Sequence, residues 1–155
     1  SSYASYEDSR QFQKEKKEVE SVVGSSMTCG RQHYLNFSVP KTWQNYEDAS
    51  LLYDSTMGYA DLPGFRSGVC YEYSVFNILT RKKLHLIEKP LIVMECTIFE
   101  ERYMNLQADK SYEEIIKYID IIKKYRGEFT LLWHNNRLEN KWQRELYIKV
   151  LSYAK

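Results

Sequence analysis

Three segments of the sequence end in a side chain that can pair charge or move a proton. Arg31 follows a strand expected to end at Gly30, Asp54 follows a short apolar stretch, and His134 follows an apolar, aromatic run that ends at Trp133. In a parallel α/β sheet the carboxyl ends of the strands face one side. We therefore expect a guanidinium, a carboxylate and an imidazole to converge. The arginine would keep the carboxylate ionised, and the histidine would exchange a proton.

Several candidate side chains also have a simpler explanation. Taken alone, His134 is explained as a strand cap hydrogen-bonded to a loop. Its expected convergence with Arg31 and Asp54 favours a functional role. Glu95 fits a site-facing acid and a paired structural carboxylate equally well. Arg66, in a glycine-containing loop, is a candidate for binding a sugar acid or phosphate.

The elements that must position these residues alternate along the chain. Hydrophobic spacing and cap residues predict helices at 8–23, 43–49, 111–126 and 140–153, and strands at 27–30, 51–53, 91–94 and 129–133. A long loop covers 57–70, residues 75–79 form a short apolar segment, and 81–83 form a solvated surface. Helices alternating with buried strands predict an α/β fold of parallel βα units.

Composition bounds the class of protein. The chain has 155 residues, 43% of them hydrophobic and 15% aromatic, which suffices for the core of a single domain covering 1–155. Its net charge of +1 offers no field to hold nucleic acid or an anionic membrane. No apolar run approaches the roughly 20 residues that span a bilayer. Three widely spaced cysteines favour buried thiols in a reducing, cytoplasmic compartment.

Short motifs in this order resemble those of the polysaccharide (carbohydrate) deacetylases with the nodulation-deacetylase type of distorted β/α barrel. Arg31-Gln32-His33-Tyr34 resembles the family's third motif, R-x-P-Y, with His33 in place of proline. The Asp54-Ser55 pair resembles the fourth motif, and the run 131–134, Leu-Leu-Trp-His, matches the fifth, L-x-x-H. Residues 58–61 and 64–70 resemble a bacterial subgroup from surface-polysaccharide pathways. The resemblance covers about residues 25–150, so the chain would form the C-terminal sector of such a barrel.

The resemblance implies roles for individual residues. Arg31 would position the catalytic base, Asp54 would hold that arginine, and His134 would be the general acid that protonates the leaving amine. Tyr34 would line the substrate groove. Besides Tyr34, the candidate substrate-binding residues are His33, Arg66 and Trp133. The substrate would be an N-acetylated sugar or polysaccharide that loses an N- or O-acetyl group.

The family's first two motifs, which carry the base and the metal ligands, do not occur in this sequence. The chain opens without a preceding strand, so we expect the N-terminal part of the domain to be missing. We therefore expect no metal site and no cofactor in this chain, with a zinc-like divalent ion held by one aspartate and two histidines in the complete protein. Two alternatives stay open, a non-catalytic carbohydrate-binding domain and a structural half-barrel. Sheet edges exposed by missing strands would favour self-association.

Overall fold

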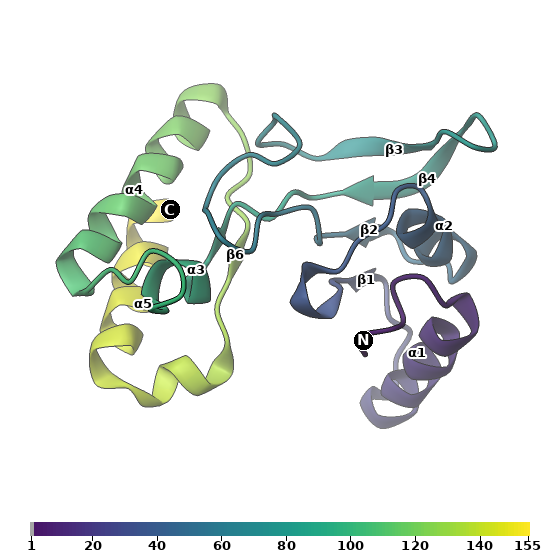
Figure 1. The fold of residues 1–155 in the computed structure, drawn as a ribbon, viewed down its shortest axis with the longest axis horizontal. Helices are drawn as coiled ribbons and strands as arrows, with labels where there is room; N and C mark the ends of the chain where they lie inside the picture. Colours follow the sequence, from purple (N-terminus) through teal and green to yellow (C-terminus); the bar gives the residue numbers. More distant parts are fainter. Residues whose placement is uncertain (1) are drawn as a thin grey trace. The chain divides into compact units, whose positions relative to one another are not determined.

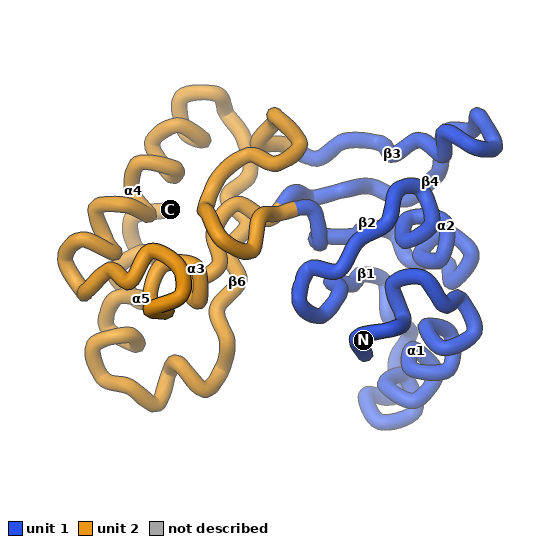
Figure 2. The backbone as a smooth tube through the Cα atoms, viewed as in Figure 1, with its two compact units in different colours: residues 1–57, 72–90 blue, residues 58–71, 91–155 orange. Residues whose placement is uncertain are grey.

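The chain is divided into two compact units (Figure 2). The computed structural model describes residues 2–155. Unit 1 comprises Ser1–Met57 and Glu72–Pro90, and unit 2 comprises Gly58–Tyr71 and Leu91–Lys155. Within residues 2–155, no helix is both long and apolar enough to cross a membrane.

Unit 1 is built on a four-stranded sheet in the order β1-β2-β4-β3 (Figure 1). The strands are β1 (Cys29–Gly30), β2 (Tyr53–Asp54), β3 (Tyr73–Asn77) and β4 (Lys82–Glu88). β1, β2 and β4 run parallel, whereas β3 pairs with β4 in the antiparallel sense. The helical elements of this unit are α1 (Ser9–Val23), the 3₁₀ turn η1 (His33–Leu35) and α2 (Lys41–Asp48).

Unit 2 combines a two-stranded parallel sheet with three helices. Its strands are β5 (Val93–Met94) and β6 (Leu131–Leu132). Its helical elements are α3 (Glu95–Phe99), α4 (Ala108–Tyr125), the 3₁₀ turn η2 (Asn135–Glu139) and α5 (Lys141–Ala154). The fold is therefore α/β with parallel strands, as the sequence predicts, and neither sheet closes into a barrel.

The ends of α1 lie where the sequence predicts them, whereas the start of α4 does not. Asp8 caps α1 by accepting from the amides of Arg10 and Gln11, and Gly24 ends it in the left-handed conformation, with φ of 73°. The sequence predicts that this helix starts with Ser111 as its cap residue, which is wrong, because α4 begins three residues earlier, at Ala108. The Ser111 hydroxyl instead donates to the carbonyls of residues 106 and 107 inside the first turn.

The β3–β4 hairpin departs from the predicted purely parallel sheet. Alternation along β4 buries Leu84, Leu86 and Glu88 while Lys82 and Lys83 stay exposed. The predicted solvated surface at 81–83 is thus confirmed as exposed, but it opens a strand. The missed signal was this period-two pattern, which a lysine-rich start and a carboxylate end disguise.

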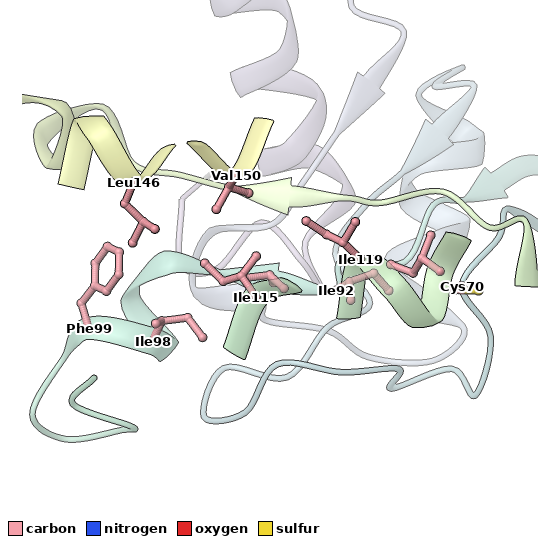
Figure 3. Close-up of a cluster of buried hydrophobic side chains, with 10 residues drawn as sticks. Cys70, Ile92, Ile98, Phe99, Ile115, Ile119, Leu146 and Val150 are labelled. Atoms are coloured by element: carbon pink, nitrogen blue, oxygen red, sulfur yellow. The ribbon is translucent and has the colours of Figure 1, made fainter. Parts of the chain in front are cut away.

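Each unit has its own apolar core. In unit 1, α1 and α2 contribute Phe12, Trp43 and Tyr46, which pack with Val75 and Leu86 of the sheet. In unit 2, side chains from the β5 segment and from α3, α4 and α5 meet around Ile115 and Ile119 (Figure 3). The full cluster is Cys70, Ile92, Val93, Ile98, Phe99, Ile115, Ile119, Ile122, Leu146 and Val150.

Ile119 tests the core of unit 2, because it is 1% exposed whereas Ile121 of the same helix is 39% exposed. Replacing Ile119 with alanine should lower the free energy of unfolding by about 2–5 kcal/mol, through lost burial and a residual cavity. The matched Ile121→Ala change should cost less than about 1 kcal/mol. Urea unfolding followed by circular dichroism measures both, and equal effects would contradict this packing.

Candidate functional site

The carboxyl ends of β5 and β6 bring Glu95 and His134 together in unit 2. The parallel register pairs Met94 with Leu132, so the residues that follow each strand emerge at the same edge. Glu95 is the next residue after β5 and begins α3, and His134 lies two residues beyond β6. The predicted strand 129–133 is confirmed only at 131–132, so His134 follows the strand without ending it, and the run is half-buried and not buried as expected.

A short hydrogen bond links the two side chains. His134 Nδ1 lies 2.6 Å from Glu95 Oε1. The Glu95 carboxylate is fully buried, whereas 43% of the His134 side chain is exposed. A buried carboxylate on Nδ1 fixes the orientation and tautomer of the ring and leaves Nε2 for a ligand or solvent. Of the two interpretations of Glu95, the structure shows the paired carboxylate, and its partner is the candidate catalytic histidine.

Cys96 completes a three-residue cluster. Its Sγ lies 3.1 Å from Glu95 Oε1 and 3.4 Å from His134 Nδ1. Burial, together with the negative charges of Glu95 and Glu100, raises the pKa of the Cys96 thiol to about 12, although Arg137 acts in the opposite direction. Such a thiol is protonated at neutral pH and is a poor nucleophile.

Arg137, on η2, holds this cluster from one side. Its Nη2 donates to Glu100 at 2.5 Å and approaches Cys96 Sγ at 3.5 Å. Its Nε lies 3.6 Å from Glu95 Oε1. The hydrogen bond to Cys96 and the carboxylates of Glu100 and Glu95 raise the pKa of Arg137. Among residues 2–155, Glu95 Oε2 has no hydrogen-bond partner although it is buried.

Cys96 and Arg137 were missed by the sequence analysis, which treated all three cysteines as core thiols. Only Cys70 is buried, whereas Cys29 is exposed and Cys96 is partly exposed, and all three are free. The available signal was local: Cys96 adjoins Glu95, and Arg137 closes the polar run that starts at His134. Nothing in the spacing links these two segments, which the β5–β6 pairing brings together.

In unit 1, Arg31 and Asp54 lie at the ends of neighbouring parallel strands, as predicted. Gly30 pairs with Asp54, and Asp54 pairs with Glu88. The Arg31 guanidinium donates to the carbonyl of Ser55 at 2.8 Å and to its hydroxyl at 2.5 Å. Burial lowers the pKa of Arg31, while the negative charge of the neighbouring acids opposes that change. Arg31 therefore braces the segment after β2 through Ser55.

Asp54 and Glu88 form a buried pair of carboxyl groups. Asp54 Oδ1 accepts from the Ser55 amide at 2.7 Å and from the Thr56 hydroxyl at 2.5 Å. Glu88 accepts from the Trp43 indole at 2.9 Å and from the amide of residue 57 at 3.1 Å. Burial and then the charge of Glu88 raise the pKa of Asp54 well above its usual value. Two adjacent buried acids favour a shared proton, with Asp54 as its carrier, which opposes the prediction that Arg31 keeps this carboxylate ionised.

The predicted substrate-binding residues divide between the units. In unit 1, the His33 ring stacks on Tyr34 at 4.2 Å, and Tyr34 is 66% exposed. In unit 2, Arg66 donates to the Gly58 carbonyl at 2.9 Å, which ties the loop together. Trp133 packs edge-on against Phe99 at 5.3 Å and joins the rim of the core.

The convergence of Arg31 and Asp54 with His134 stays a prediction, because these residues belong to different units. Comparison with known proteins adds no relative. No protein-family model, curated protein or solved structure matches this chain. The geometry within each unit must therefore carry the functional argument.

The Asp54–Glu88 pair predicts how the stability of unit 1 depends on pH. The pKa of Asp54 is higher in the folded chain than its value of about 3.9 in an unfolded chain. The folded chain thus binds more protons between these values, and its free energy of unfolding falls as pH rises from about 4 through the folded pKa. Asp54→Asn should flatten this decline, because the amide oxygen can still accept the hydrogen bonds of Ser55 and Thr56 but the side chain no longer titrates.

Urea unfolding measured over a pH series by circular dichroism tests the expectation. Asp48→Asn is the matched control, since Asp48 is an exposed aspartate of unit 1 outside the buried pair. A wild-type slope in Asp54→Asn would show that the two acids do not share a proton.

Proposed function

We propose that the chain belongs to a polysaccharide-deacetylase-like hydrolase and provides the proton donor of its site. The observation that carries the proposal is the buried Glu95 carboxylate held 2.6 Å from Nδ1 of the half-exposed His134. A carboxylate bonded to Nδ1 orients an imidazole so that it can donate or accept a proton at Nε2. The order of the motifs around Arg31, Asp54 and His134 supplies the substrate class, an acetylated sugar.

The chemistry assigned to His134 is the last proton transfer of acyl hydrolysis. When a tetrahedral intermediate collapses, the departing amine or alcohol needs a proton, which His134 Nε2 would donate. Glu95 holds Nδ1 and compensates the positive charge that the ring carries before it gives up the proton. Cys96, held as a thiol, takes no covalent part, because the pKa of its Sγ is raised to about 12.

Arg31 and Asp54 keep their proposed roles in unit 1, Arg31 as the residue that positions a base and Asp54 as its anchor. The bracing of Arg31 on Ser55 supports a fixed guanidinium. The chain would form a sector of a β/α barrel. The parallel pairings of β1, β2 and β4 and of β5 with β6 support this proposal.

The zinc-like ion of the resembled family would polarise the acetyl carbonyl and activate water. The residues described here do not fit its ligand set of one aspartate and two histidines. Of the chain's three histidines, His33 stacks on Tyr34, His85 pairs with Glu47 at 2.8 Å, and His134 pairs with Glu95. We therefore propose that this chain is incomplete for catalysis.

The alternative function is carbohydrate binding without hydrolysis on the same fold. The observation that favours it is the same mismatch: within residues 2–155, the one group suited to a metal is Glu95, Cys96 and His134. Exposed aromatic rings such as Tyr34 provide flat surfaces on which a sugar can stack.

An N-acetylglucosamine oligomer should shift the ring signals of His134 saturably in a nuclear magnetic resonance titration, whereas the deacetylated glucosamine oligomer should not. The reason is that the proposed site places the acetyl group beside Nε2. His85 is the internal control, because it forms the same Nδ1–carboxylate pair, with Glu47, on a fully exposed side chain. Equal shifts at both histidines, or none at His134, would contradict the proposal.

Acetate release separates hydrolysis from binding. We expect none from the 155-residue chain with added zinc or cobalt, because its described residues do not assemble an aspartate with two histidines. The measurement is an enzymatic acetate assay with the same oligomer, compared with His134→Gln. Turnover above that variant would show that the chain is complete for catalysis.

A further inference from the structure

A cluster of three different metal-ligating side chains lies at the edge of the β5–β6 sheet. One carboxylate oxygen of Glu95, the Sγ of Cys96 and one ring nitrogen of His134 all lie within 4.8 Å of one another. We propose that these residues form a binding site for zinc or a similar borderline-soft divalent cation, with three protein ligands and an open fourth position. This proposal does not rest on the deacetylase function.

The distances in the cluster are close to those of a tetrahedral zinc site. Zinc binds sulfur, nitrogen and oxygen at about 2.0–2.3 Å, which puts tetrahedral ligand atoms about 3.3–3.7 Å apart. The Cys96 Sγ already lies 3.4 Å from His134 Nδ1 and 3.1 Å from Glu95 Oε1. The Sγ–Oε1 separation of 3.1 Å must open by a few tenths of an ångström, and the Nδ1–Oε1 separation of 2.6 Å by roughly 1 Å at most.

The second oxygen of Glu95 points to a missing ligand independently of these distances. Glu95 is fully buried, and no described residue offers its Oε2 a hydrogen bond. A buried carboxylate oxygen without a partner loses its solvation uncompensated, which is unfavourable. A cation bound at the carboxylate removes that cost.

The backbone holds the three ligands with little freedom. Glu95 and Cys96 are consecutive residues in the first turn of α3, and the Met94–Leu132 register fixes His134 beside them. The partly exposed side of His134 gives the cation access and leaves room for a water as the fourth ligand. Such pre-placement lowers the entropy lost on binding.

Charge and ligand type favour zinc over magnesium or calcium. A thiolate, a carboxylate and a neutral imidazole around a divalent ion give a neutral centre. Arg137 lies 3.5 Å from Cys96 Sγ and 3.6 Å from Glu95 Oε1, and its charge is paired with Glu100 at 2.5 Å. Mixed sulfur, nitrogen and oxygen donors suit zinc, whereas magnesium and calcium prefer oxygen alone. On binding, the Cys96 S–H bond breaks and its proton goes to solvent, while the imidazole carries its proton on Nε2.

Cobalt(II) is the probe, because it occupies zinc sites and absorbs light. Titrating the 155-residue chain with cobalt should give one equivalent of binding, a thiolate-to-cobalt band in the near ultraviolet and the strong visible bands of a tetrahedral ion, all abolished by zinc. Cys96→Ser should lose the near-ultraviolet band. His134→Gln should weaken binding by at least about tenfold through loss of one ligand.

The chain offers matched controls for both changes. Cys29→Ser removes an exposed thiol of unit 1, and His85→Ala removes the other carboxylate-paired histidine, so both should bind cobalt like the wild type. Circular dichroism checks that each variant folds. The decisive ligand variant is His134→Gln, because His134 is partly exposed, whereas a change at the fully buried Glu95 could unfold the chain. Absence of the thiolate band, or its loss in Cys29→Ser with retention in Cys96→Ser, would overturn the site.

Discussion

The parallel register of very short strands is the constraint on which both candidate sites depend. Gly30, Asp54 and Glu88 align across three strands of unit 1, and Met94 aligns with Leu132 in unit 2. Because side chains alternate with a period of two, a slip by one residue would turn the aligned acids away from their partners. Apolar packing in each unit stabilises these strands, and the strand ends then determine which polar groups meet.

Those strand ends bury acids in both units, and the two clusters differ in how their charge is compensated. In unit 1, Asp54 and Glu88 lie wholly inside, with indole, amide and hydroxyl donors around them. Both acids are 0% exposed, which suits a structural role for the pair. In unit 2, Glu95 meets a histidine whose side chain is 43% exposed. Only the second cluster links a buried charge to solvent, so it is the one suited to chemistry.

Sequence patterns predicted the local features of the fold and one half of the candidate site. Cap residues such as Asp8 and Gly24 act within a few residues, so the ends of α1 could be read directly. The β3–β4 hairpin was missed because the period-two burial along β4 begins at two lysines and ends at a carboxylate. His134 was found as the end of an aromatic run, but its contact with Cys96 spans 38 residues. A contact of that range follows from tertiary packing, which no local spacing encodes.

The cluster around His134 can hold a proton or a cation at Nδ1, but not both. With the proton, Nδ1 donates to Glu95 and Nε2 is free to give and take protons, as the proposed general acid requires. With a cation, Nδ1 and Glu95 are both ligands, the Cys96 thiol becomes a thiolate, and the support that Glu95 gives the ring is lost. The same three side chains therefore define two exclusive states, and zinc bound there would block proton transfer at His134. A metal at this cluster would thus oppose the proposed chemistry, unlike the ion that activates water in the resembled deacetylases.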